Sequence, residues 1–334
     1  MTITIREITP EDPSALHAWW EVGAAASAER PFPAWASWEV SQVTWSQART
    51  DIDQVFLLAE VDGHAVGAGR LVCFLTDNTH LTDLEVYVAP AERRRGIGTA
   101  LLTELEERAA SAGRSTYFMS VPTPVHSDGA GVPFAAAHGY PVASREETKL
   151  VDLDDTAGWA ALDAEVAARL GDYRLEVFED VTPDHWVDGV CTMLGAFIGE
   201  VPAGDLDLEA ANWTPDRLRE HEARTRDTDR AWVVGVAVAP DGSLCGFTEV
   251  GVSRQDPRLG RIGGTLVLPG HRGHALGLGM KLATHRRVRE LFPSCESIET
   301  TNADVNAWMN AINVRMGYRI VERLLDVQKM VRAS

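Results

Sequence analysis

The chain has 334 residues, about twice the length of a typical domain, so two domains are expected. A composition of 45% hydrophobic and 24% charged residues is typical of a globular protein, and no apolar run is long enough to predict a transmembrane helix. The formal net charge of −18 argues against a nucleic-acid or anionic-membrane surface, because binding to phosphates requires clustered cations. The N-terminus lacks an export signal, so cytoplasmic residence is expected.

Four scattered cysteines (Cys73, Cys191, Cys245 and Cys295) predict neither a disulfide framework nor a metal site. They are expected to be small buried side chains in a reducing compartment.

The first half begins with a strand, Ile3–Ile8, and then a helix for which Thr9 is the expected N-cap, followed by Pro10. The segment after it holds a group of tryptophans: Trp19, Trp20, Trp35, Trp38 and Trp45. Such a group is either an aromatic pocket for an apolar or cationic substrate or a packed core.

Two strands and a turn come next. Val55–Glu60 and Ala65–Phe74 flank Asp62-Gly63, and an Asp-Gly pair between apolar runs predicts a hairpin.

A third strand, Leu84–Val88, leads through Pro90 into Arg93-x-x-Gly96-x-Gly98 at the start of a helix. The first turn of a helix leaves backbone N–H groups unpaired, and the helix dipole adds positive potential there. Glycines allow close approach of an anion and arginines add charge. This segment therefore predicts a site for a phosphate or diphosphate.

The second half repeats the whole pattern, which indicates an internal duplication. Both halves close on a helix ending in Gly-Tyr and a final strand, and the loop arginine precedes this Gly-Tyr by almost the same number of positions in each. The second copy consists of Tyr173–Phe178, Thr182-Pro183 as the expected start of a helix, Ala231–Val238, Asp241-Gly242, Leu244–Val252, Thr265–Pro269, Gly270–Gly279 and Gly317-Tyr318.

The element order in each half, β-α-β-β-β-α-β-α-β, predicts an α/β class with a mixed sheet. The expected division is an N-terminal domain at 1–154, a linker helix at 155–171 and a C-terminal domain at 172–334.

The segment Val-x-Pro-x-x-Arg-x-x-Gly-x-Gly at a strand–helix junction resembles the acyl-CoA motif of the GNAT superfamily. The resemblance spans both halves and implies two tandem GNAT acyl-CoA N-acyltransferase folds, an arrangement similar to that of mycothiol synthase. It further implies that acetyl-CoA is the co-substrate, with no metal. The residues it assigns to cofactor binding are Val86, Val88, Arg93, Arg94, Arg95, Gly96, Ile97, Gly98, Thr99, Val267, Arg272, Gly273, His274, Ala275, Leu276, Gly277 and Asn302.

The second loop departs from the motif. Arg272-x-x-Ala275-x-Gly277 keeps the register but replaces the first glycine, whereas His274-x-x-Gly277-x-Gly279 restores both glycines and loses the arginine. Either register could present backbone amides to a phosphate.

The acceptor end is less regular. In the superfamily a tyrosine four residues before the closing Gly-Phe or Gly-Tyr often protonates the CoA thiolate; here Ala135 and Asn313 occupy that position. The second half carries Asn302, a candidate helix N-cap, together with Asn306 and Asn313, whereas Pro122–Pro133 in the first predicts a loop.

The candidate catalytic residues are therefore Asn306, Asn313 and, as general base, Glu249. Glu85 is the corresponding candidate in the first half, and either glutamate could instead be a solvated or paired strand residue. His271 and His274 have a suitable pKa range for a base but lie beside the phosphate loop, where binding is the expected role.

The expected activity is acetylation of a primary amine on a small molecule, by direct attack in a ternary complex. A protein lysine or N-terminal acetyltransferase and a non-catalytic acyl-CoA sensor are the alternatives. The expected partner is the small-molecule amine, without nucleic acid or membrane, in a monomer or homodimer. The second half is the preferred site of catalysis.

Overall fold

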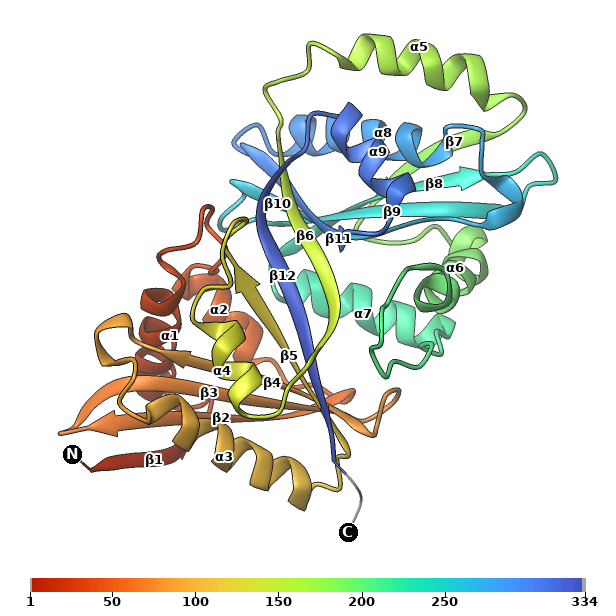
Figure 1. Cartoon of the computed structure of the whole chain (residues 1–334). Coiled ribbons are helices and arrows are strands. Elements are labelled where there is room, and N and C mark those ends of the chain that lie inside the picture. The colour runs from red at the N-terminus through yellow and green to blue at the C-terminus, as the bar shows by residue number, and fades with distance from the viewer. Residues whose placement is uncertain (1, 332–334) are drawn as a thin grey trace. The chain divides into compact units, whose positions relative to one another are not determined.

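The computed structural model describes residues 2–331, which divide into two compact units. Unit 1 comprises Met1–Arg145, Gly204–Glu209 and Glu322–Ser334, and unit 2 comprises Glu146–Ala203 and Ala210–Val321. The predicted mixed α/β architecture is confirmed in each (Figure 1).

Unit 1 is built on a sheet with the strand order β1-β2-β3-β4-β5-β12. Its strands are β1 (Ile3–Ile8), β2 (Ile52–Val61), β3 (His64–Phe74), β4 (Leu81–Val88), β5 (Thr116–Thr123) and β12 (Arg319–Met330). β4 and β5 are parallel and the other neighbours are antiparallel. The expected hairpin joins β2 to β3, with Asp62 and Gly63 both at positive φ.

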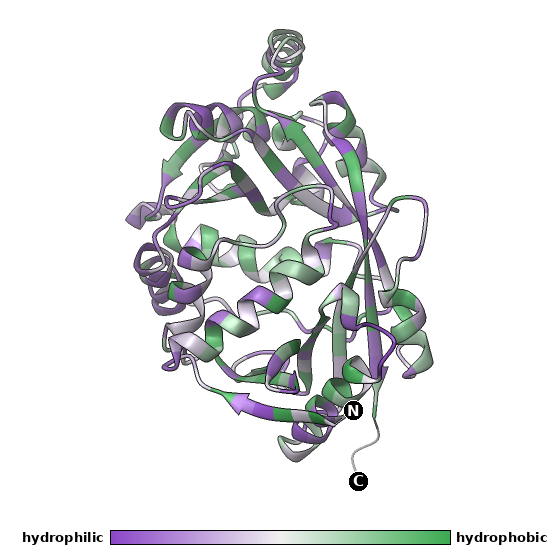
Figure 2. Cartoon of the chain, turned by 90° about the vertical axis from the view of Figure 1, so that its left-hand side faces the viewer, coloured by the Kyte–Doolittle hydropathy of each residue, from purple (hydrophilic) through white to green (hydrophobic). Residues whose placement is uncertain are grey.

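Helices cover both faces of this sheet. α1 (Pro13–Ser27) and α2 (Trp38–Ser46) lie on one face, and α3 (Ile97–Ser111) and α4 (Gly131–Ala137) lie on the other. The apolar run of β2 reflects this, because Phe56 and Leu58 face α1 while Leu57 and Ala59 face α3. The helices themselves carry both hydrophilic and hydrophobic residues along their length (Figure 2), as helices that bury one face do.

Unit 2 repeats this plan with the strand order β6-β11-β10-β9-β8-β7. Its strands are β6 (Val142–Asp152), β7 (Arg174–Glu179), β8 (Arg230–Val238), β9 (Leu244–Ser253), β10 (Leu259–Val267) and β11 (Ser297–Ala303). α6 (Val187–Glu200) and α7 (Pro215–Asp227) lie on the face that corresponds to α1, and α5 (Trp159–Leu170), α8 (Leu276–Leu291) and α9 (Ala307–Arg315) lie on the other.

The units do not coincide with the division predicted at 154 and 172. β6, the closing strand of the first half, pairs with β11 of unit 2, and β12, the last strand of the chain, pairs with β5 of unit 1. Each half thus supplies its final strand to the sheet of the other half. The expected linker helix, α5, packs into the core of unit 2 through Trp159, Leu162 and Val166.

Both predicted threonine N-caps are wrong. α1 begins later, where the Asp12 carboxylate accepts from the Ser14 and Ala15 amides and Pro13 takes the first helical position. Thr182 precedes a short 3₁₀ turn, and its amide donates to buried Glu222.

Across residues 2–331, no helix is both long and apolar enough to cross a membrane. Within the same range, no group of three His, Cys, Asp or Glu side chains is arranged to hold a metal ion.

Candidate active site

The predicted phosphate loop of unit 1 lies between β4 and α3. A 3₁₀ turn (Pro90–Glu92) leads into it, Arg94 and Gly96 adopt left-handed backbone (φ 65° and 85°), and Gly96 caps α3. No side chain of the described residues caps this helix, so its first amides point outward unpaired. Arg93 folds back on the loop, donating from Nε to the Val88 carbonyl at 3.3 Å. Left-handed residues alternating with others bring successive amides into one concavity, which is a common anion site.

The loop of unit 2 has the same backbone. A 3₁₀ turn (Pro269–His271) precedes it, and Gly273 and Ala275 are left-handed (φ 96° and 56°). Arg272 Nε donates to the Val267 carbonyl at 3.0 Å, as Arg93 does to Val88. Of the two registers the sequence allowed, the structure therefore has Arg272-x-x-Ala275-x-Gly277. Ala275 keeps the conformation of Gly96 despite the steric cost of its Cβ there.

Beside each loop, two parallel strands separate. β4 pairs with β5 only from Leu81 to Asp83, and β10 pairs with β11 only from Leu259 to Arg261. Within the described part of the chain, no strand pairs on that edge with the rest of β4, which carries Val86 and Val88, or with the rest of β10, which carries Val267. Such an edge offers free N–H and C=O groups to an extended ligand.

Glu249 lies on β9 beside a bulge in β10. The pairing of β9 with β10 shifts between Ile262 and Gly264, which leaves Gly263 as the extra residue. A Cβ on Gly263 would meet the Glu249 Oε1 at 2.5 Å, so the carboxyl group lies against the bulged backbone. The bulge comes directly after the last β10–β11 pair, where the two strands separate. Bulges are frequent beside active sites, where they redirect groups.

The Glu249 carboxylate has no hydrogen bond or ion pair with any of residues 2–331, and it is only partly buried. Its surroundings are apolar: Trp232 on β8 and Phe197 on α6 contact the same bulge. Burial raises the pKa of Glu249 to about 7. A carboxyl group without a partner and with a pKa near neutrality is suited to accept a proton.

The same position in unit 1 is filled differently. Arg70 on β3 occupies the position that corresponds to Glu249 on β9. Its guanidinium forms an ion pair with Glu85 at 2.9 Å, and the Tyr87 hydroxyl also donates to Glu85. Glu85 is thus a paired strand residue, as one of the two interpretations expected. Asp83, which the sequence did not single out, is a further acid there: burial and Glu85 raise its pKa to about 7.

The tryptophan group of unit 1 forms a core. Trp19 is fully buried, donates to the Gly69 carbonyl at 2.9 Å, and contacts Trp35, Trp45 and Tyr87. Of the two roles considered for these residues, the structure supports core packing for Trp19.

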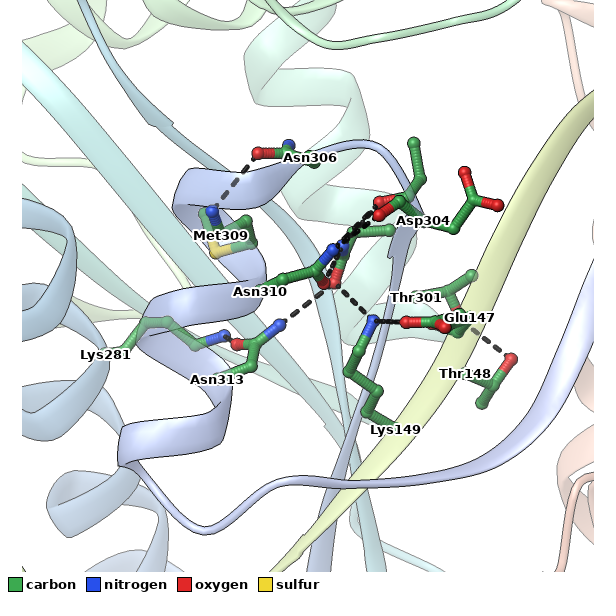
Figure 3. A network of polar contacts seen from close by, with 12 residues as sticks. Glu147, Thr148, Lys149, Lys281, Thr301, Asp304, Asn306, Met309, Asn310 and Asn313 are labelled. Carbon is green, nitrogen blue, oxygen red and sulfur yellow. Dashed lines mark hydrogen bonds and ion pairs between the residues drawn. The ribbon is translucent and has the colours of Figure 1, made fainter. Parts of the chain in front are cut away.

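The three asparagines of unit 2 have distinct positions. Asn306, not Asn302, caps α9 by accepting from the Met309 amide at 3.1 Å, and the Asn306 side-chain nitrogen has no partner among the described residues. Asn302 lies on β11, beyond the last β10–β11 pair, and donates to Asn310. Asn313 is fully buried on α9 and bonds to Asn302 and Lys281 (Figure 3).

Direct donation from Asn313 to a thiolate is therefore not supported. Its carbonyl oxygen accepts from Lys281 and its nitrogen donates to Asn302, and no part of it is exposed. Lys281 itself was missed, although it interrupts the apolar stripe of Leu278, Leu282 and Val288 on α8, which is a readable signal.

The two loop histidines bind within unit 2. His271 pairs with the Tyr173 hydroxyl at 3.1 Å, and His274 lies 3.3 Å from the Arg169 carbonyl. Both histidines lie in the loop that follows β10, beyond Val267, whereas Glu249 faces Gly264 earlier in β10. This position suits a role in shaping the loop.

Comparison with known proteins agrees with this geometry. Residues 16–140 match the model of the acetyltransferase (GNAT) family. Among curated protein sequences, none matches the chain significantly.

Solved structures match along the whole chain. A tandem GNAT protein from the clavulanic acid biosynthesis pathway is 25% identical, with a TM-score of 0.81 and 100% of both chains covered. A GCN5-related N-acetyltransferase from Sphaerobacter thermophilus is 17% identical (TM-score 0.69; 99% of this chain, 96% of that one) and shares the fold. A putative acetyltransferase from Pyrococcus horikoshii is 16% identical (TM-score 0.59; 99% and 90%) and shares it too.

The two strand–loop–helix sites, the separating strands beside them and these matches lead to one assignment: the chain has the fold of tandem GNAT proteins, and its residues 16–140 match the acetyltransferase (GNAT) family.

Proposed function

We propose that the chain transfers an acetyl group from acetyl-CoA to a primary amine of a small molecule, and that unit 2 performs the reaction with Glu249 as general base. The observation that carries the proposal is the unpaired Glu249 carboxyl group at the point where β10 leaves β11. The match of residues 16–140 to a family of acetyltransferases supports an acetyl donor.

The residues of the loop would hold the diphosphate of CoA. The free first-turn amides of α8, with Gly273 and Ala275 left-handed, would donate to the phosphate oxygens. The unpaired edge of β10 would bind the extended arm of the same molecule. Asn306, whose side-chain nitrogen has no partner among residues 2–331, is a further donor at the start of α9.

An amine attacks a thioester only as the neutral base, so the substrate ammonium must first lose a proton. Glu249, with a pKa near 7, can accept that proton at neutral pH without holding it too tightly. The amine nitrogen then bonds to the acetyl carbon, the carbon–sulfur bond breaks, and the sulfur leaves as the thiolate. The nitrogen loses its second proton to solvent or to the departing sulfur, which gives the amide and the free thiol. Because the acetyl group passes directly from sulfur to nitrogen, both substrates must be bound together.

The surroundings of Glu249 favour a small amine. Trp232 and Phe197 give the region apolar aromatic walls, which can hold the carbon part of the amine or its cation. The net charge of −18 attracts cations in general and so increases the rate of encounter.

The test is release of free thiol from acetyl-CoA with a panel of amines. Glu249→Gln is expected to lower kcat/KM by about 10²–10⁴-fold, the usual contribution of general base catalysis. Glu85→Gln, at the paired glutamate of unit 1, is the matched control and should keep most of the activity. Equal loss in both variants would contradict the assignment of the base.

A second pair of variants tests which unit reacts. Asn306→Ala should reduce turnover, and Gly96→Trp, which fills the loop of unit 1, should not. If Asn306→Ala keeps full turnover and folded Gly96→Trp loses it, catalysis belongs to unit 1. If acetyl-CoA binds but no amine or peptide accepts the acetyl group, the chain is a sensor.

A further inference from the structure

Two lysines and two asparagines form a chain of polar contacts in unit 2, and Figure 3 shows Lys149, Lys281 and Asn313 of it. Lys281 Nζ donates to Asn313 Oδ1 at 2.6 Å, and Asn313 Nδ2 donates to Asn302 Oδ1 at 2.9 Å. Lys149 on β6 donates to the same Asn302 oxygen at 3.2 Å. Lys281 and Asn313 are both 0% exposed and Lys149 is buried, whereas Asn302 is partly exposed, so the chain of bonds runs from the interior to Asn302.

Unit 1 shows that the fold does not need this chain. When the two units are aligned on their loop arginines, Leu102 takes the position of Lys281. When they are aligned on their closing Gly-Tyr pairs, Ala135 takes the position of Asn313. The strand registers place Val121 and Val327 at the positions of Asn302 and Lys149. All of these unit 1 residues are apolar, and they lie in one core cluster. A buried cation in place of leucine is costly, so its presence calls for a reason beyond packing.

The location suggests the reason. Asn302 lies beyond the last β10–β11 pair, on the part of β11 that has separated from β10. Asn313 lies four residues before Gly317, where the superfamily resemblance places the tyrosine that acts on the thiol. The bonded chain thus ends on the part of β11 that has separated from β10, where the proposed function places the bound acyl-CoA.

The charges that face Lys281 come from several elements. Lys149 is 3.0 Å from Glu147, so those two charges balance each other. The Tyr318 ring faces the ammonium at 4.6 Å, and burial raises the pKa of Tyr318, so its phenol stays neutral. His285, on α8 itself, has a pKa well below its usual value because it is buried, and it is neutral too.

No carboxylate of the described chain contacts Lys281, so its charge is not cancelled locally. Burial, with Lys149 nearby, lowers the pKa of Lys281 to about 7. The ammonium is therefore present below neutral pH and is lost as the pH rises.

We propose that Lys281 is a positioning residue for acyl transfer: through Asn313 it holds the Asn302 side chain at the open end of β11, and from the interior its charge adds positive potential at the place where the thiolate departs. This inference rests on the proposed function of unit 2. It accounts for a site that has no tyrosine, since a nearby positive charge stabilises a thiolate without transferring a proton.

The protonation states of Glu249 and Lys281 predict how turnover changes with pH. Turnover requires Glu249 without its proton and Lys281 with its proton, so the rate should rise and then fall around neutrality. Removing the Lys281 charge should abolish the fall of the rate at alkaline pH. The rise of the rate from acidic pH, which reflects loss of the Glu249 proton, should remain.

The decisive variant restores the residues of unit 1, Lys281→Leu with Asn313→Ala, a pair that this fold already accommodates. Lys281→Met removes the charge alone, and Leu102→Met in unit 1 is the matched control. The first two should fold, lower kcat by about 10–100-fold and lose the alkaline fall, whereas the control should do neither. A folded double variant with the kcat and pH profile of the original chain would overturn the inference.

Binding separates this inference from the proposed function. If the original chain binds acetyl-CoA but acetylates no amine, the proposed function fails, and calorimetry then decides about Lys281. In a Gly96→Trp background, which leaves only the loop of unit 2, the double variant should bind acetyl-CoA about tenfold more weakly. Unchanged affinity would reject a positioning role.

Discussion

Replacing Glu249 by glutamine should stabilise the protein above neutral pH while it removes acetyl transfer. The carboxyl pKa is raised from 4.5 to about 7 in the folded chain. Each pKa unit corresponds to about 1.36 kcal/mol, so the charged form costs folding about 3 kcal/mol. This is an upper limit for the gain, because the glutamine amide will also lack a partner.

The sign of the pH dependence is fixed by the direction of the shift. A carboxyl group with a raised folded-state pKa does not disfavour folding below its unfolded pKa of about 4.5. Its cost grows as the pH rises towards 7 and is fully present above that. The gain from Glu249→Gln should therefore be small at pH 5 and largest at pH 8.

Urea unfolding of the two proteins at pH 5 and pH 8 measures this difference. Glu85→Gln is the control, and it should instead destabilise the chain by about 1 kcal/mol because the Arg70 and Tyr87 donors lose their carboxylate. A gain for Glu249→Gln that is the same at both pH values, or absent at pH 8, would refute the reasoning that Glu249 is unpaired and desolvated.

Other predictions follow from the loops and the charge. Gly96→Ala should destabilise unit 1 by about 1 kcal/mol, because the new Cβ meets no atom within 4 Å and only the left-handed backbone is strained. Ala275→Gly should stabilise unit 2 by a similar amount, and a loss of stability on urea unfolding would contradict the shared loop geometry. Duplex DNA should show no tight binding in a mobility shift at about 0.15 M salt, since the net charge is −18.

The local features were readable from the sequence because they depend on a few adjacent residues. Asp62-Gly63 encodes a turn with two left-handed residues, and Arg93 to Gly98 encodes a strand–helix loop. The exchange of β6 and β12 could not be read in this way, because the apolar pattern of a strand does not say which neighbour it will pair with. The domain boundaries differ for that reason.

The site was predictable in part. Glu249 was predicted as a candidate general base on a strand, with a solvated or paired residue as the alternative. Its lack of a partner depends on the bulge at Gly263, which shifts the facing strand. Asn313 was correctly placed on the closing helix, but its burial depends on Lys281, which is 32 residues away. Asp12 rather than Thr9 is the N-cap of α1, because the helix begins at Pro13, with this proline in the first helical position.

The two units differ in a consistent direction, and this makes a final prediction. At three positions unit 2 has the costly choice: Glu249 unpaired, Ala275 left-handed and Lys281 buried. Unit 1 has an ion pair, a glycine and a leucine at the same positions. Neutral sequence change would not concentrate three destabilising residues in one unit. Selection for activity, in contrast, retains strained or unpaired groups at a functional site.

The combined variant Glu249→Gln, Ala275→Gly, Lys281→Leu and Asn313→Ala should therefore unfold at a higher urea concentration than the original chain while transferring no acetyl group. The expected gain is a few kcal/mol at pH 8, with the Glu249 part small at pH 5. Lys281 and Asn313 share a hydrogen bond and are changed together, whereas within residues 2–331 Glu249 and Ala275 form no side-chain bond with either of them, so the separate gains should nearly add. A combined variant that is less stable than the original chain would mean that these groups support the fold, and it would contradict their retention in unit 2 for catalysis.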